Sequence, residues 1–218
     1  MSGLRNLGVV VLFSTFLCGA MSADKGFQWQ WRRMEDVEKS STQSVRTMAQ
    51  LKLTAREKAS IVDASLSAMS NSPMYQYAKD EEIKEYIEHA DCRFEDLDGD
   101  SVPELIMEGQ GPEECEGVGN CALRVFRKQG GEYKLVFNSV AQTLMVDRSG
   151  GRPLLVLYTH NSATAGDLTT YVFPRSANAR KVMECGVFWN NSPFIGENTP
   201  GRPTGAPILQ QCKYFTTR

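Results

Sequence analysis

A series of short strand-like segments, which starts near residue 92, constrains the fold more than any other feature of the chain. The segments show a period of two or short apolar runs, and both patterns are typical of β-strands. The turns between them, such as Gln129-Gly130-Gly131 and Ser149-Gly150-Gly151, are too short to hold a crossover helix, so neighbouring strands should pair antiparallel. Residues 154–158 are apolar on both faces, which predicts a central strand. The expected strands are 92–95, 104–108, 122–127, 133–138, 143–147, 153–159, 168–173 and 182–189.

Two helices are expected before these strands. The sequence Thr54-Ala55-Arg56-Glu57 has the form of a capping box, which opens a helix, and Asn71-Ser72-Pro73 ends it. A shorter helix should follow Asp80. Each predicted helix has one apolar stripe that suits packing against a sheet; the stripes are Val62, Leu66 and Met69 in the first, and Ile83, Tyr86, Ile87 and Ala90 in the second. The predicted fold class is α+β: N-terminal helices followed by an antiparallel β-meander, as a single twisted sheet or a small sandwich.

The N-terminus has the pattern of a secretory signal. Arg5 precedes a largely apolar run over residues 7–20, and small residues follow up to Ala23. Cleavage after Ala20 or after Ala23 fits the pattern, and an uncleaved anchor or a buried first helix are the alternatives. The run is short for a membrane span, and none is expected after cleavage. We therefore expect a signal peptide (1–23), a polar arm or helix (24–52) and a single α+β domain (53–218) that is β-rich from about residue 91, in a periplasmic or secreted protein.

Composition narrows the class further. The chain has 218 residues, and its 41 % of hydrophobic residues is enough for the core of one domain. The formal net charge is −2, so the sequence offers no strongly basic surface for nucleic acid. The sequence does not favour a zinc site, because it has only two histidines and no CxxC motif.

Cysteine spacing predicts two disulfides. Removal of the signal would remove Cys18 and leave five cysteines, an odd number. Cys115 and Cys121 enclose a short loop with two glycines that closes easily in an oxidising compartment. The natural second pair is Cys185 with Cys212, which would tie the C-terminal tail to the last predicted strand, and Cys92 is then the odd one.

An acidic stretch, DLDGDSVPE at residues 96–104 (the acidic loop), lies between two predicted strands. Asp96, Asp98 and Asp100 alternate, so a tight loop would bring their carboxylates together, as hard cations such as calcium require. The carbonyl of Val102 and the carboxylate of Glu104 would complete the ligand set. An EF-hand is excluded, because its sixth position needs glycine and its twelfth needs glutamate, whereas Ser101 and Met107 stand there. A turn without metal is the alternative, since Asp, Gly and Ser are common turn residues.

The acidic loop resembles that of single-copy FG-GAP or VCBS-like modules of uncharacterised exported bacterial proteins, written D-L-D/N-G-D-G-x-x-E/D. Asp96-Leu97-Asp98-Gly99-Asp100 and Glu104 match it, and Ser101 departs where glycine is usual. Residues 111–137, 160–173 and 184–189 resemble later strands of the same modules more weakly. The resemblance implies a strand-to-strand loop with calcium as its ion, and it implies no activity.

Other residue groups offer weaker candidates for chemistry. His160, Ser162 and Asp167 are near one another in sequence but are also usual turn residues. The acidic group Glu113, Glu114 and Glu116 fits a solvated rim better than a glycosidase pair, and His89 with Cys92 fits a helix end and a half-buried thiol. Aromatic anchors for a protein or glycan partner are Trp29, Trp31, Trp189 and Phe194.

The sequence therefore predicts an exported, non-enzymatic binding or interaction protein with a calcium-type acidic loop, whose ligand is a protein or a glycan. The alternative is an exported hydrolase whose site the sequence does not reveal.

Overall fold

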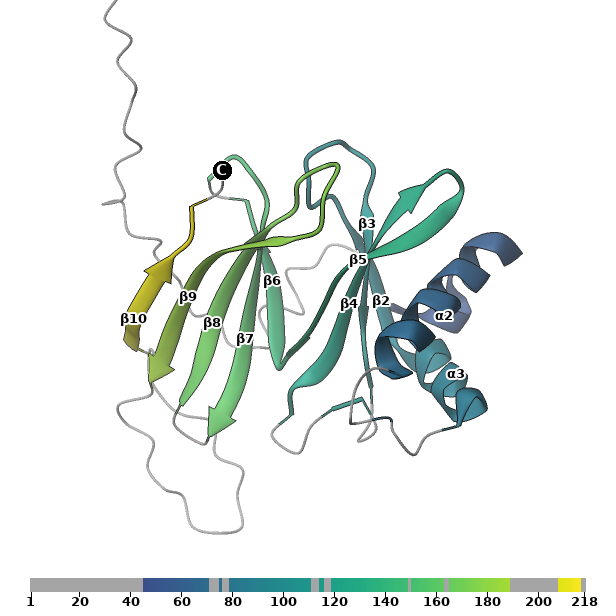
Figure 1. The fold of residues 1–218 in the computed structure, drawn as a ribbon, viewed down its shortest axis with the longest axis horizontal. Coiled ribbons are helices and arrows are strands. Elements are labelled where there is room, and N and C mark those ends of the chain that lie inside the picture. Colours follow the sequence, from purple (N-terminus) through teal and green to yellow (C-terminus); the bar gives the residue numbers. More distant parts are fainter. Residues whose placement is uncertain are drawn as a thin grey trace, which may run out of the picture. The chain divides into compact units, whose positions relative to one another are not determined.

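The computed structural model describes residues 45–70, 75, 79–110, 114–115, 119–148, 150–162, 165–188 and 208–216. The expected signal (1–23) and most of the expected arm (24–52) lie outside these residues. Within them the chain forms two antiparallel five-stranded sheets and two α-helices (Figure 1), so the fold class is α+β, as the sequence predicts.

The first sheet has the strand order β1-β2-β3-β4-β5. Consecutive strands pair as antiparallel neighbours, and the two-residue turn at Gly130 and Gly131, both at positive φ, joins β4 to β5. The strands are β1 (Arg46–Thr47), β2 (Asp91–Glu95), β3 (Glu104–Glu108), β4 (Cys121–Gln129) and β5 (Glu132–Ala141).

The second sheet has the order β10-β9-β8-β7-β6, again antiparallel throughout. The chain enters it directly from β5, because only Gln142 separates Ala141 from β6. The strands are β6 (Thr143–Asp147), β7 (Leu154–Ser162), β8 (Ala165–Val172), β9 (Arg180–Phe188) and β10 (Ile208–Tyr214). β7 has a partner on each side, as its apolar sequence predicts.

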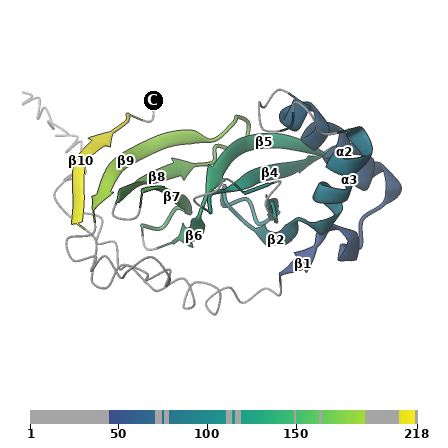
Figure 2. The same cartoon turned by 90° about the horizontal axis from the view of Figure 1, so that it is seen from below.

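Two helices cover one face of the first sheet (Figure 2). Helix α2 (Ala55–Ser70) opens with the predicted capping box: the Glu57 carboxylate accepts from the Thr54 amide at 2.8 Å, and the Thr54 hydroxyl accepts from the Glu57 amide at 3.2 Å. Helix α3 (Asp80–His89) follows. Ile61, Met69, Ile83 and Ile87 of the helices form one core with Cys92, Leu105, Met107, Phe126 and Tyr133 of the sheet.

The opposite face of the first sheet forms a second core with the second sheet. Side chains alternate along a strand, so Leu105 and Met107 of β3 face the helices while Ile106 faces the second sheet. The members of this core are Leu97, Ile106, Leu123, Val125, Val136, Ala141, Leu144, Leu155, Leu157 and Phe173. The acidic loop lies at the edge of this core, since its Leu97 is a fully buried member.

Three expectations need correction. The strands form two sheets packed on each other, which excludes the single twisted sheet and leaves the sandwich-like arrangement. The α-helices are not the first described elements, because β1 and a short 3-10 helix, η1 (Met48–Gln50), precede them. Residues 46–50 belong to the expected polar arm, yet Met48 is buried. β10 lies C-terminal to 182–189, the last strand that the sequence predicts. No helix within the described ranges is long and apolar enough to cross a membrane.

Candidate functional site

The acidic loop connects β2 to β3 and so lies at one end of a two-strand hairpin, as predicted. Two of its residues have a positive φ in the left-handed region, Gly99 at 76° and Ser101 at 70°. Glycine adopts such angles without cost, whereas serine is strained by them. Position 101, where the loop pattern that the sequence resembles has glycine, therefore has a backbone angle that suits glycine, although serine occupies it here.

Each acidic side chain of the loop binds backbone amides of the loop itself. Asp96 accepts from the amides of Gly99 at 2.8 Å and Ser101 at 3.0 Å, and Glu104 reaches back to the Leu97 amide at 2.9 Å. Asp98 accepts from Asp100 at 3.0 Å, and Asp100 from Val102 at 2.7 Å. These bonds hold the carboxylates in fixed directions, and each carboxylate oxygen keeps a further lone pair for another partner.

Three of the five predicted ligands come together. One carboxylate oxygen each from Asp96, Asp98 and Glu104 lies within 4.8 Å of the other two, a grouping that suits one hard cation. Asp100 is not a member of this group, because its carboxylate turns to the amide of Val102. Val102 is half exposed, and the ligand role of its carbonyl stays a prediction.

Arg127 of β4 faces the same carboxylates from inside the protein, and the sequence pattern did not single it out. Its Nε donates to Glu104 at 2.9 Å, and its Nη2 lies 3.3 Å from Asp98 Oδ2. Its Nη1 donates to the carbonyls of Pro174 and Arg175, both at 2.8 Å. Arg127 therefore joins the acidic loop on the first sheet to the turn between β8 and β9 on the second.

Burial governs the electrostatics of this group. The Asp98 and Glu104 side chains are almost entirely shielded from solvent, and this desolvation raises the pKa of both carboxyls, while Arg127 opposes the rise. Among the described residues, Asp98 Oδ2 has no hydrogen-bond partner despite its burial, and its ion pair with Nη2 of Arg127, at 3.3 Å, compensates its charge only in part. A buried carboxylate oxygen without a hydrogen bond is costly, and a cation at that point would offset the cost.

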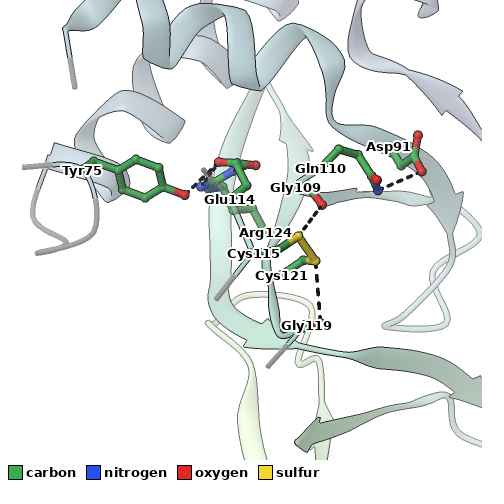
Figure 3. Close-up of a disulfide and its surroundings, with 9 residues drawn as sticks. All are labelled: Tyr75, Asp91, Gly109, Gln110, Glu114, Cys115, Gly119, Cys121 and Arg124. Atoms are coloured by element: carbon green, nitrogen blue, oxygen red, sulfur yellow. Dashed lines mark hydrogen bonds and ion pairs between the residues drawn. A yellow bond between two sulfur atoms is a disulfide. The ribbon is translucent and has the colours of Figure 1, made fainter. Parts of the chain in front are cut away.

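The short cysteine loop forms a second polar group, shown in Figure 3. Cys115 and Cys121 are disulfide-bonded, as predicted, and the adjacent Glu114 points inward to Arg124 of β4. Arg124 donates to Glu114 at 2.8 and 3.3 Å, and the Tyr75 hydroxyl donates to the same carboxylate at 3.0 Å. Glu114 and Arg124 are essentially inaccessible to solvent, so the expected solvated rim is wrong for Glu114; Glu113 and Glu116 lie outside the described residues.

The second predicted disulfide, Cys185–Cys212, is also present and fastens β10 to β9. Two disulfides indicate an oxidising, non-cytoplasmic environment. Cys92 is the remaining free thiol within the described residues. It is fully buried rather than half buried, its Sγ lies 3.6 Å from the Ala90 carbonyl, and burial raises its pKa to about 12, so it is not a reactive thiolate.

The candidate triad does not share one face of the sheet. Asp167 is paired with Thr159 across β7 and β8, whereas His160, the next residue of β7, points to the other face. The Asp167 carboxylate accepts from the Asn161 amide at 2.8 Å instead. His89 bonds to the Glu85 carbonyl at the end of α3, as expected of a helix-end histidine.

The proposed aromatic anchors Trp29, Trp31, Trp189 and Phe194 lie outside the described residues. Comparisons with protein-family models, curated proteins and solved structures find no match to this chain. The resemblance to FG-GAP or VCBS-like modules therefore stays an expectation from the motif, and the geometry of the site carries the functional argument.

Proposed function

We propose that this protein is an exported, non-enzymatic binding protein in which the acidic loop holds one calcium-type cation as a structural element. The observation that carries the proposal is the convergence of Asp96, Asp98 and Glu104, which each place one carboxylate oxygen within 4.8 Å of the others. Oxygen ligands of this kind suit Ca²⁺, which accepts flexible geometry and several carboxylates.

The charge balance favours a divalent ion. Three carboxylates carry −3 when ionised, and Arg127 supplies +1, which leaves −2 in a largely buried group. A divalent cation would neutralise this remainder and would lie near Asp98 Oδ2, the buried oxygen that lacks a hydrogen bond among the described residues.

Arg127 also supports a structural role over a catalytic one. Because its guanidinium links the loop to the β8–β9 turn, an ion at the loop would rigidify the junction of the two sheets. Arg175 of that turn adds a second link by donating to the Gly99 carbonyl at 2.9 Å. The proposed ion therefore strengthens a scaffold that displays binding surfaces elsewhere on the protein.

Thermal unfolding tests the proposal. Protein stripped with EDTA should gain about 2.7 kcal/mol of unfolding free energy in calcium at 100 times its Kd, which corresponds to a rise in Tm of about 5–11 °C for a domain of this size. Asp98→Asn should lose this rise, whereas Asp100→Asn, outside the converging group, should keep most of it. The rise should shrink at acidic pH, because burial raises the pKa of Asp98 and Glu104 and protons then compete with the ion.

An unchanged Tm of the wild type in saturating calcium would contradict the proposal and leave Arg127 as the counter-charge of the buried carboxylates. Retention of the full rise in Asp98→Asn would also contradict it, because the ion would then lie elsewhere.

A further inference from the structure

The second sheet contains a cavity of about 320 Å³ that is separate from the acidic loop. It opens over β7 to β10 on the face of that sheet that points toward the first sheet, beyond the part covered by the shared core. The strand register identifies this face. Leu157 of the shared core and Thr159 are two residues apart on β7, so their side chains lie on the same face of the sheet. Asp167 of β8 pairs with Thr159 and therefore lies on that face as well. The lining residues are Asn161, Ala165, Gly166, Asp167, Glu184, Gly186, Phe188, Gln211 and Lys213.

The cavity exists because Gly186 has no side chain. Gly186 lies between Glu184 and Phe188 on the same face of β9, and it pairs with Asp167 on β8. A Cβ at Gly186 would meet the Phe188 ring at 3.0 Å, so the ring leans over the space above the glycine. The floor is therefore backbone, and the walls are an aromatic ring and polar side chains.

The disulfide Cys185–Cys212 fixes the two walls of the cavity. Cys185 lies between Glu184 and Gly186, and Cys212 lies between Gln211 and Lys213, so each cysteine points away from the cavity that its neighbours line. β10 carries an irregularity here, with Gln211 at a φ of 53°. The covalent bond beneath the cavity thus holds an otherwise strained edge strand in place, which lowers the ordering cost of binding.

The chemistry of the walls favours a neutral polyol over a charged ligand. Among the lining residues, Asp167 and Glu184 carry two negative charges and Lys213 carries one positive charge. Lys181 lies outside the lining but pairs with Glu184 at 3.0 Å and so offsets the second negative charge. The balance is zero, so the site has no net charge to attract an ion. Carboxylates, amides and an ammonium group provide both acceptors and donors, which sugar hydroxyls match because each hydroxyl can donate and accept.

The Phe188 ring supplies the apolar contact that a sugar ring needs. Phe188 is 38 % exposed beside the polar wall, and an aromatic face packs against the C–H face of a pyranose. The volume is at the small end of ligand sites, which fits one sugar unit better than a large cofactor.

We propose that this cavity binds one neutral saccharide unit of a glycan, and that the Cys185–Cys212 disulfide preorganises it. This proposal names the ligand class of the binding protein. It rests on the proposed function, in which the protein binds its ligand without converting it.

Amide NMR spectra of the full chain test the proposal during titration with glucose, galactose, mannose and N-acetylglucosamine. We expect at least one sugar to shift the Gly186 and Asp167 amides in a saturable manner with a Kd near the millimolar range. Gly186→Val fills the cavity with a residue that strands favour, and it should weaken binding at least tenfold. Gly150→Ala, in an open turn, is the matched control and should leave binding unchanged.

The Cys185→Ser/Cys212→Ser variant keeps every lining side chain and should still bind, but several-fold more weakly. Equal affinity in this variant would overturn the preorganising role of the disulfide. Absence of shifts with all four sugars, or shifts with L-lysine alone, would overturn the saccharide assignment. If no sugar binds but calcium still raises the Tm of the wild type and not that of Asp98→Asn, the saccharide site is refuted and the proposed calcium site is not. Hydrolysis of a bound oligosaccharide would instead refute the non-enzymatic function.

Discussion

The buried ion pair beneath the cysteine loop gives the sharpest stability prediction. In Glu114→Gln the side chain keeps its shape but loses its charge, and Arg124 is left charged in a site with about 2 % of its side chain exposed. Removal of one partner from a buried ion pair costs about 3–5 kcal/mol. For a domain of this size we expect the Tm to fall by about 6–20 °C.

The assay is urea unfolding of the oxidised protein, combined with a double-mutant cycle. Glu114→Gln/Arg124→Met removes both charges, so it should cost less than the sum of the two single variants, with a coupling of at least about 1 kcal/mol. The Tyr75 hydroxyl, which donates to Glu114 at 3.0 Å, can still donate to the side-chain carbonyl oxygen of the introduced glutamine in both variants that carry it. A cost below about 1 kcal/mol for Glu114→Gln, or additivity in the cycle, would refute the buried-pair reasoning.

Three further predictions concern other parts of the fold. Gly99→Ala should lower the free energy of unfolding by about 1–2 kcal/mol, because Gly99 has a φ of 76° that alanine adopts only with strain, although the space around it is open. Gly150→Ala should change this free energy by no more than about 0.5 kcal/mol. Equal urea midpoints for the two variants would contradict the prediction. The hydrogen bond from Lys128 lowers the pKa of Glu57 from 4.5 to about 2, below its value in the unfolded chain. The pair therefore stabilises the fold at pH above about 4.5, and this contribution is lost as the pH falls toward 2. The urea midpoints of the wild type and Glu57→Gln should converge at low pH, and a constant difference between them at all pH values would contradict this prediction. Cys92 should resist iodoacetamide at pH 8 in the native protein and react fully in urea, because burial raises its pKa to about 12; rapid native labelling, followed by mass spectrometry, would show that the thiol is accessible.

The sequence predicts most strands because alternation is a direct consequence of strand geometry. The predicted strands 104–108 and 143–147 coincide with β3 and β6. Turn residues lie on both sides of β3, and Ser149-Gly150-Gly151 follow β6. β1 escapes prediction because two residues cannot show a period, and it is held by pairing with β2 rather than by its own pattern. β10 is missed because Gln210, Gln211 and Lys213 at its centre are polar and because an irregularity there breaks the alternation.

The candidate site is predicted in part for a similar reason. Local spacing is sufficient to place Asp96, Asp98 and Glu104 together, since all three belong to one loop. It does not reveal Arg127, which is distant in sequence and reaches the loop only because β4 pairs with β3. One signal is nevertheless present: Arg124 and Arg127 interrupt the apolar strand ALRVFR, and charged residues in a buried strand need a partner nearby.

Burial distinguishes the carboxylates of Asp98 and Glu104 from those of an exposed acidic turn. An exposed turn leaves its carboxylates to water, whereas Asp98 and Glu104 have side-chain exposures of 0 and 1 %. Their ionised forms must therefore be stabilised by Arg127 or by an ion.

Isothermal titration of calcium into EDTA-stripped protein tests the central claim most directly, with Asp98→Asn measured beside the wild type. The converging carboxylates of Asp96, Asp98 and Glu104 predict one calcium site per chain in the wild type and loss of that site in the variant. Absence of calcium binding to the wild type, or equal binding by Asp98→Asn, would contradict the proposed role of the acidic loop.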